Sequence, residues 1–172
     1  MVQKIKRTAN KSPEQALAAL MRLCAAAERS SGDALRLMRG WGVAEPDARR
    51  VLDRLTAERF IDDARYACAF VRDRMNLSGW GRYKIESALR AKGIAPSVIA
   101  DAMAQTAGTD MRERLSEILA RRMRTLKAAS PFDARSKLLR YALSQGYDFD
   151  TARECVERCI PDTGEGEGVF FS

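Results

Sequence analysis

The sequence predicts an all-α protein made of three tandem three-helix repeats that form an elongated, curved array. Apolar residues recur with helical spacing along most of the 172 residues. Four of the five prolines stand where a helix is expected to begin, and three glycines stand where one is expected to end. These glycines are almost evenly spaced, and a fixed spacing of this length is typical of helical repeats.

The first helix of each repeat carries its apolar side chains on one face. We expect these helices at about residues 13–28, 63–75 and 110–127. The earliest begins at Ser12-Pro13, because a serine can accept a backbone N–H at the helix start and proline suits the first turn. Its apolar face holds Leu17, Leu20 and Cys24.

Each repeat continues with two helices that are joined at a glycine. Gly42, Gly93 and Gly146 each follow a helical stretch, and they are 51 and 53 residues apart. Apolar residues precede them at the same offsets, eight and four residues upstream: Ala34, Ile85 and Leu138, then Met38, Leu89 and Ala142. The last helix of each repeat is expected to begin near Pro46, Pro96 or Asp150. The shared offsets indicate three copies of one unit.

A three-helix unit of this size buries little apolar surface, so neighbouring units are expected to stack and extend the core. The chain then divides into five segments. These are a basic arm at 1–11, helical repeats at 12–58, 59–107 and 108–160, and an acidic, glycine-rich tail at 161–172. The arm and the tail have no helical pattern, and we expect them to be disordered.

The composition excludes several classes of enzyme. The chain contains no histidine, so a Ser-His-Asp or Cys-His mechanism is excluded, and the commonest zinc ligand is missing. The four cysteines form no Cys-x-x-Cys pair and are expected to be small buried residues. No secretory leader and no membrane-spanning apolar run is evident. We therefore expect a cytoplasmic monomer with no catalytic site, no metal and no cofactor.

Asp62 and Asp63 stand side by side, as the carboxylates of a hydrolase or metal site could. Neighbouring residues on a helix point about 100° apart, so the two carboxylates do not easily converge on one ligand. No third acid or histidine nearby completes a site. We interpret Asp63 as the cap of the helix that begins there, with Tyr66 and Phe70 anchoring that helix to the core.

Basic residues outnumber acidic ones, 30 to 23, which favours a polyanionic partner. Residues 110–148 carry nine positive and five negative side chains, net +4, whereas residues 149–172 carry two and six, net −4. The stretch GWGRYK (79–84) combines aromatic and basic residues, which suits a phosphate backbone or an acidic protein face, although a solvated surface is the alternative. The expected partner- or DNA-binding residues are Arg72, Arg74, Arg82, Lys84, Arg90, Lys92, Arg121, Arg122, Arg124, Lys127, Arg135, Lys137 and Arg140.

The stretch from Ser31 to Gln105 resembles the RecX family, bacterial regulators of the RecA recombinase. The resemblance is carried by FIDD at 60–63, Tyr66-Ala67, Gly81 and LRAKGI at 89–94, and it extends through the repeat offsets over about residues 13–160. We expect its signature positions to be structural: Asp63, Tyr66, Gly42, Gly81, Gly93 and Gly146.

The resemblance implies a modulator, mainly an inhibitor, of RecA. Such a protein binds the filament of RecA on single-stranded DNA and limits filament growth, strand exchange and ATP hydrolysis, with no catalytic site of its own. The alternative is a stand-alone helical DNA-binding protein that inserts helix-turn-helix-like pairs into a duplex groove. Against it, the stretch from Ser97 to Gln105 offers no cation for reading bases.

Overall fold

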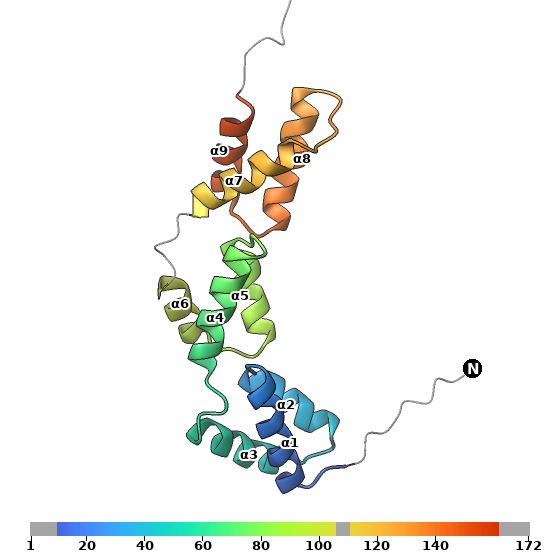
Figure 1. Ribbon diagram of the computed structural model, residues 1–172, viewed down its shortest axis with the longest axis vertical. Helices are drawn as coiled ribbons and strands as arrows, with labels where there is room; N and C mark the ends of the chain where they lie inside the picture. The colour runs from blue at the N-terminus through green and yellow to red at the C-terminus, as the bar shows by residue number, and fades with distance from the viewer. Residues whose placement is uncertain (1–9, 106–110, 162–172) are drawn as a thin grey trace, which may run out of the picture. The chain divides into compact units, whose positions relative to one another are not determined.

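The protein is all-α over the residues that its structure, a computed structural model, describes: 10–105 and 111–161. Within these ranges there are helices and connecting loops but no strand (Figure 1). The helices are α1 (Pro13–Ala26), α2 (Ser31–Gly40), α3 (Glu45–Ala57), α4 (Asp63–Asn76), α5 (Arg82–Ala91), α6 (Pro96–Gln105), α7 (Met111–Met123), α8 (Pro131–Ser144) and α9 (Phe149–Cys159). None of these described helices is long and apolar enough to span a membrane. The predicted fold class is confirmed, whereas most of the basic arm and almost all of the acidic tail lie outside the described residues.

The predicted helix starts follow from local capping. Ser12 accepts the backbone N–H of Gln15 at 3.2 Å, and the Gln15 side chain accepts the N–H of Ser12 at 3.0 Å, which satisfies two donors at the start of α1. Ser130 caps α8 in the same way through the N–H of Asp133. Both helices have proline in the first turn, as expected.

Two first helices end earlier than predicted. Helix α1 stops at Ala26 because Ala27 turns to an extended conformation. Helix α7 stops at Met123 rather than near residue 127. After Met123 the N–H of Thr125 donates to the carbonyl of Arg122, three residues earlier, at 3.2 Å. This tighter hydrogen-bond pattern, in place of the four-residue pattern of an α-helix, ends α7.

The glycine turns are confirmed in all three repeats. Gly42, Gly93 and Gly146 follow α2, α5 and α8 with φ of 74°, 78° and 90°, a region that only glycine adopts without strain. In each turn the next residue donates its N–H back to a carbonyl five residues earlier: Val43 to Met38, Ile94 to Leu89 and Tyr147 to Ala142. This bond satisfies a helix-end carbonyl and gives the three turns one shape.

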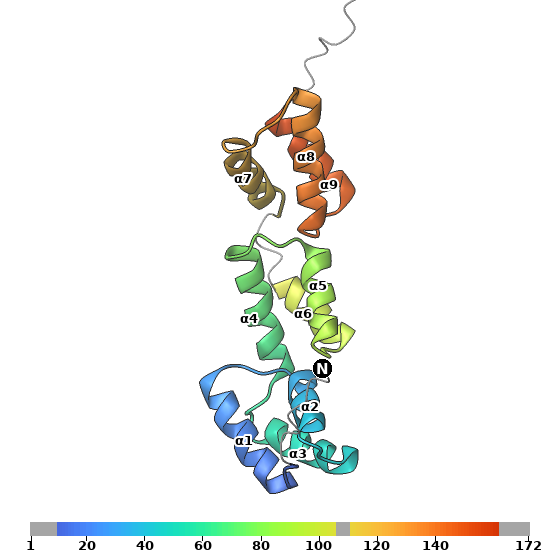
Figure 2. The same cartoon turned by 90° about the vertical axis from the view of Figure 1, so that its right-hand side faces the viewer.

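The described chain forms two compact units. The first contains residues 10–72 and 86–105, and the second contains residues 73–85 and 111–161, so α4 and α5 contribute to both. In the first, α1, α2 and α3 pack together around Leu20, Met38 and Leu55 (Figures 1 and 2). In the second, α7, α8 and α9 pack around Leu115, Leu119 and Leu138. The boundaries that we assigned to the repeats stay a prediction.

Within the first unit, the start of α2 docks on the glycine turn between α5 and α6. The fully buried Ser30 donates its hydroxyl to the carbonyl of Lys92 at 2.9 Å. Gly32 lies so close to that carbonyl that a Cβ at this position would overlap it. The side chain of Lys92 also forms an ion pair with Asp33, with Nζ and Oδ2 3.1 Å apart.

Within the second unit, the start of α5 docks on the glycine turn between α8 and α9. The N–H groups of Gly81 and Tyr83 donate to the carbonyls of Gln145 and Gly146 at 2.7 and 3.0 Å. A Cβ on Gly81 would be 2.5 Å from the backbone of Gly146 and Tyr147. In both units, therefore, a middle helix places its positive N-terminal end on the carbonyls of the next repeat's turn.

Neither outer end of the described chain offers the same docking contact. Helix α8 begins fifteen residues before its glycine, whereas α2 and α5 begin eleven before theirs, so α8 has about one extra turn there. That turn presents Phe132, which is 75% exposed. At the other end the glycine turn is already covered, because Lys11 donates its N–H to Trp41 at 3.0 Å and Asn10 lies against Gly42.

Tyr147 at the second junction should give the stability a distinct pH dependence. Its ring is buried, its hydroxyl donates to the Gly79 carbonyl at 3.4 Å, and burial raises the pKa of Tyr147 to about 12. Since the unfolded chain releases this proton near pH 10, the stabilisation is complete below that pH and is lost as the pH rises towards 12. Urea unfolding should show a decrease of roughly 1–3 kcal/mol across this window. Tyr147→Phe should remove most of that decrease, and an unchanged slope in this variant would contradict the assignment.

Candidate nucleic-acid interface

The carboxylates of Asp62 and Asp63 cap two different helices and do not converge on one ligand. Asp62 caps α4 by accepting the N–H of Arg65 at 2.9 Å, and this bond lowers the pKa of Asp62. The prediction that Asp63 caps its own helix is wrong. Its two oxygens accept the N–H and the hydroxyl of Ser31 at 2.8 and 2.5 Å, so Asp63 caps the start of α2. The two carboxylates serve different helices, as their divergence on a helix requires.

The other residues that we expected to be structural lie near the core. Tyr66 and Phe70 stack with ring centroids 6.0 Å apart, and both are half-buried. Of the four cysteines, only Cys155 is fully buried, and the rest are half-buried thiols. Over the described ranges no three His, Cys, Asp or Glu side chains come together in a way that could hold a metal ion.

Two of the predicted binding residues, Arg74 and Lys84, lie over the ring of Trp80. The Arg74 guanidinium and the Lys84 ammonium lie 4.9 and 4.8 Å from its ring centroid, as in cation–π contacts. The ammonium also donates to Ser144 O and Gln145 Oε1, both at 3.3 Å. These cations stabilise the second junction, and their binding to a partner stays a prediction.

Other predicted cations near the middle of the chain have mixed surroundings. Arg90 pairs with Glu86 at 2.9 Å, and Lys92 pairs with Asp33. Arg72 and Arg82 are exposed, and Arg72 has no hydrogen bond or ion pair to another described residue. Among these four cations, therefore, Arg90 and Lys92 are engaged by carboxylates.

The run at the end of α7 and just after it is the most accessible group among the predicted cations. Arg121, Arg124 and Lys127 are exposed, and their side chains make no hydrogen bond or ion pair within the described ranges. Arg122 lies over the ring of Tyr141, with Cζ 3.9 Å from the centroid. On α8 the predicted cations are more engaged: Lys137 with Asp133 at 2.7 Å, Arg140 with Ser136 O at 3.3 Å, and the half-buried Arg135.

A polar hollow of about 320 Å³ opens beside this run, within the second unit. Two guanidinium groups line it, those of Arg114 and Arg121, together with Tyr141. The remaining lining comes from Ile118 and the 76–79 loop. Arg114 donates to the Asn76 carbonyl, but its buried Nε–H has no acceptor among the described residues. No acidic residue belongs to this lining, so the hollow carries an uncompensated positive charge.

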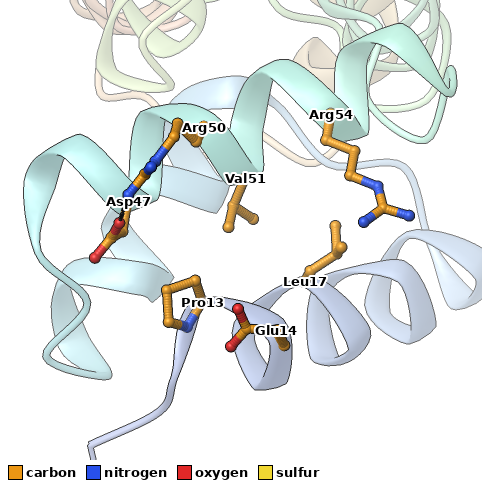
Figure 3. Close-up of a pocket in the computed structure, with 7 residues that line it drawn as sticks. All are labelled: Pro13, Glu14, Leu17, Asp47, Arg50, Val51 and Arg54. Atoms are coloured by element: carbon orange, nitrogen blue, oxygen red, sulfur yellow. Dashed lines mark hydrogen bonds and ion pairs between the residues drawn. The ribbon is translucent and has the colours of Figure 1, made fainter.

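A hollow of similar size in the first unit has a different charge. It measures about 310 Å³ and lies between α1 and α3 (Figure 3). Glu14 and Asp47 line it along with Arg50 and Arg54, and Figure 3 shows Asp47 paired with Arg50. Since acids and bases balance here, this hollow is a poor site for an anion. A larger hollow between α2 and α3, about 590 Å³, is also lined by both arginines and acids.

Sequence reasoning missed part of the charged hollow. Arg114 was counted within the basic region but was not named as a binding residue, and Tyr141 was not singled out. The available signal was the seven-residue spacing of Arg114 and Arg121, which places them on one face of α7 two turns apart. The 76–79 loop comes from another repeat, so no local pattern could place it there.

Comparisons with known proteins give consistent matches. Residues 62–103 match the family model described as RecX, second three-helix domain, and residues 110–156 match RecX, third three-helix domain. Regulatory protein RecX of Mycobacterium ulcerans (strain Agy99) is 32% identical over 145 residues, 83% of each chain. The protein of the same name from Mycobacterium leprae (strain Br4923) is also 32% identical, over 83% of this chain and 84% of its own. The crystal structure of RecX from Lactobacillus salivarius has a similar fold, with a TM-score of 0.70 at 23% identity over 86% of this chain and 96% of that one.

Proposed function

The chain belongs to the RecX family, and on this premise we propose that it binds the filament of RecA on single-stranded DNA and inhibits RecA. It limits filament growth, strand exchange and ATP hydrolysis without a catalytic site of its own. Its partners are the RecA filament and the DNA strand inside it.

The observation that carries this proposal is the accessible basic run at the end of α7. The side chains of Arg121, Arg124 and Lys127 form no ion pair with another described residue, and residues 110–148 have a net charge of +4. Both the DNA strand and an acidic protein face attract such a surface, which accelerates encounter and orients the complex. A filament offers many equivalent sites, so one chain can act on several RecA subunits.

The alternative, a stand-alone duplex-binding protein, has less support. It requires the last helix of a repeat to present cations to base edges. Helix α6 contains no basic residue. Each of the arginines of α3 is engaged in an ion pair: Arg49 with Glu45, Arg50 with Asp47, and Arg54 with Glu58.

The proposal is tested by titrating the protein into a RecA–single-stranded-DNA filament and following ATP hydrolysis. We expect inhibition at less than one chain per RecA subunit. Full ATPase activity at equimolar protein would overturn the proposal. Tight binding to duplex DNA alone, with a steep dependence on salt, would support the alternative.

Neutralising Arg121, Arg122 and Arg124 by glutamine should weaken filament binding by roughly tenfold or more, because three charges at the contact are lost. The matched control replaces Arg49, Arg50 and Arg54 by glutamine. It removes the same net charge from an exposed helix of the first unit, and it should bind nearly as the parent does. Anisotropy with labelled filament measures both, and circular dichroism checks that both stay folded. Equal affinities for the two variants would show that the basic run is only solvated.

A further inference from the structure

We propose that the polar hollow of the second unit, lined by Arg114, Arg121, Tyr141 and the 76–79 loop, binds a nucleotide of single-stranded nucleic acid. This inference rests on the proposed function, and it assigns the DNA contact to one place in the chain. It adds Arg114, Tyr141 and the loop to the basic residues that charge alone suggests.

The first argument is the arrangement of charge. Arg114 and Arg121 line the hollow from positions two turns apart on α7, and the described lining contains no carboxylate to neutralise them. The Nε–H of Arg114 is buried and has no acceptor among the described residues. A buried donor without a partner is unfavourable, and the positive charge of the two arginines attracts a phosphate group to the hollow.

The second argument is the aromatic ring and the exposed leucine at the hollow. Tyr141 lines the hollow, and the Arg122 guanidinium lies over its ring. The ring and the guanidinium form a cation–π pair beside the hollow. Leu77 at the loop is 84% exposed, so its apolar side chain is available to a ligand in the hollow. An unpaired base offers a flat apolar face to such groups, whereas a base inside a duplex does not.

The third argument is size. A volume of about 320 Å³ suits one nucleotide and is too small for a duplex groove or a folded protein segment. The hollow of the first unit has nearly the same volume but has two acids in its lining. Charge therefore distinguishes the two hollows, and only the one in the second unit suits a phosphate.

The test measures binding of fluorescein-labelled oligo(dT) to the full chain without RecA. Arg121→Gln should weaken this binding several-fold and reduce the slope of log K against log salt by about 0.7, as loss of one phosphate contact does. The control Arg158→Gln removes the same charge from α9 of the same unit, outside the lining, and should leave the slope unchanged. Photocross-linking with 4-thiothymidine should label the peptide that contains Tyr141 or the 76–79 loop.

The outcomes separate this inference from the proposed function. If oligo(dT) does not bind, or if both variants bind like the parent, the hollow is not a nucleotide site, even when the protein still inhibits the RecA ATPase. If Arg121→Gln no longer binds oligo(dT) and the parent protein does not inhibit RecA, the assignment of the hollow as a nucleotide site is supported and the proposed function is wrong. Equal displacement of oligo(dT) by polyglutamate at matched charge would also overturn the inference, because an acidic protein face would then fit as well.

Discussion

Gly81→Val should lower the free energy of unfolding of the second unit by about 1–3 kcal/mol, since overpacking against a rigid backbone is seldom relieved. A Cβ at this position would be 2.5 Å from the carbonyl carbon and oxygen of Gly146 and from the N–H of Tyr147. None of these atoms is the end of a flexible side chain that could rotate away. The start of α5 would have to move, and the bonds from Gly81 and Tyr83 to the α8–α9 turn would lengthen or break.

Urea unfolding in a Trp41→Phe background measures this effect locally. Trp80, the remaining tryptophan, lies in the second unit and reports its unfolding by fluorescence. Gly40→Ala in the first unit is the control, because a Cβ on Gly40 meets nothing within 4 Å. It should leave the transition that Trp80 reports unchanged, since the substitution fits its site and lies outside the second unit. Equal losses for Gly81→Val and Gly40→Ala would show that close docking at Gly81 is unimportant.

Much of the structure within each repeat follows from local patterns. Helical spacing, serine and proline at helix starts, and glycine at helix ends depend on neighbours a few residues away, and the helices and glycine turns that they predict are present, although α1 and α7 end earlier than predicted. The contacts between repeats depend on residues far apart in the chain. Gly81 docks on Gly146 and Asp63 caps a helix that begins at Ser31, and neither pairing leaves a local pattern. The regular glycine spacing indicated a repeat, but it did not indicate which surface of one repeat meets the next.

For the candidate site, too, the sequence predicted the local features but not the contacts between distant residues. Composition placed the excess of positive charge in the third repeat, and Arg121, Arg124 and Lys127 are indeed exposed there. A charge count could not show that Arg74 and Lys84 lie over Trp80, or that Lys92 pairs with Asp33. Partners of this kind decide whether a cation is available to a ligand, and they are known only when the fold is known. The hollow beside Tyr141 also depends on a loop from the preceding repeat.

Asp63→Ala should lower the free energy of unfolding of the first unit by about 1–3 kcal/mol, as expected when a part-buried backbone donor loses its acceptor. The N–H and hydroxyl of Ser31 both donate to this carboxylate, and the alanine variant would leave both without it. The effect should exceed that of Ser31→Ala, which removes the hydroxyl but leaves the N–H bond to Asp63 in place.

A double-mutant cycle with Asp63→Ala and Ser31→Ala isolates the contact between the two repeats. We expect a coupling energy of about 0.5–2 kcal/mol, because the hydroxyl stabilises the fold only while the carboxylate is present to accept its hydrogen bond. Asp53→Ala on α3 is the control: that carboxylate is exposed and has no hydrogen bond or ion pair to another described residue, so its loss should change stability by less than about 0.5 kcal/mol. A coupling energy near zero would mean that Asp63 does not join the repeats. A measurable one would make this aspartate, which resembles half of a catalytic pair, the acceptor through which the second repeat orders the start of α2.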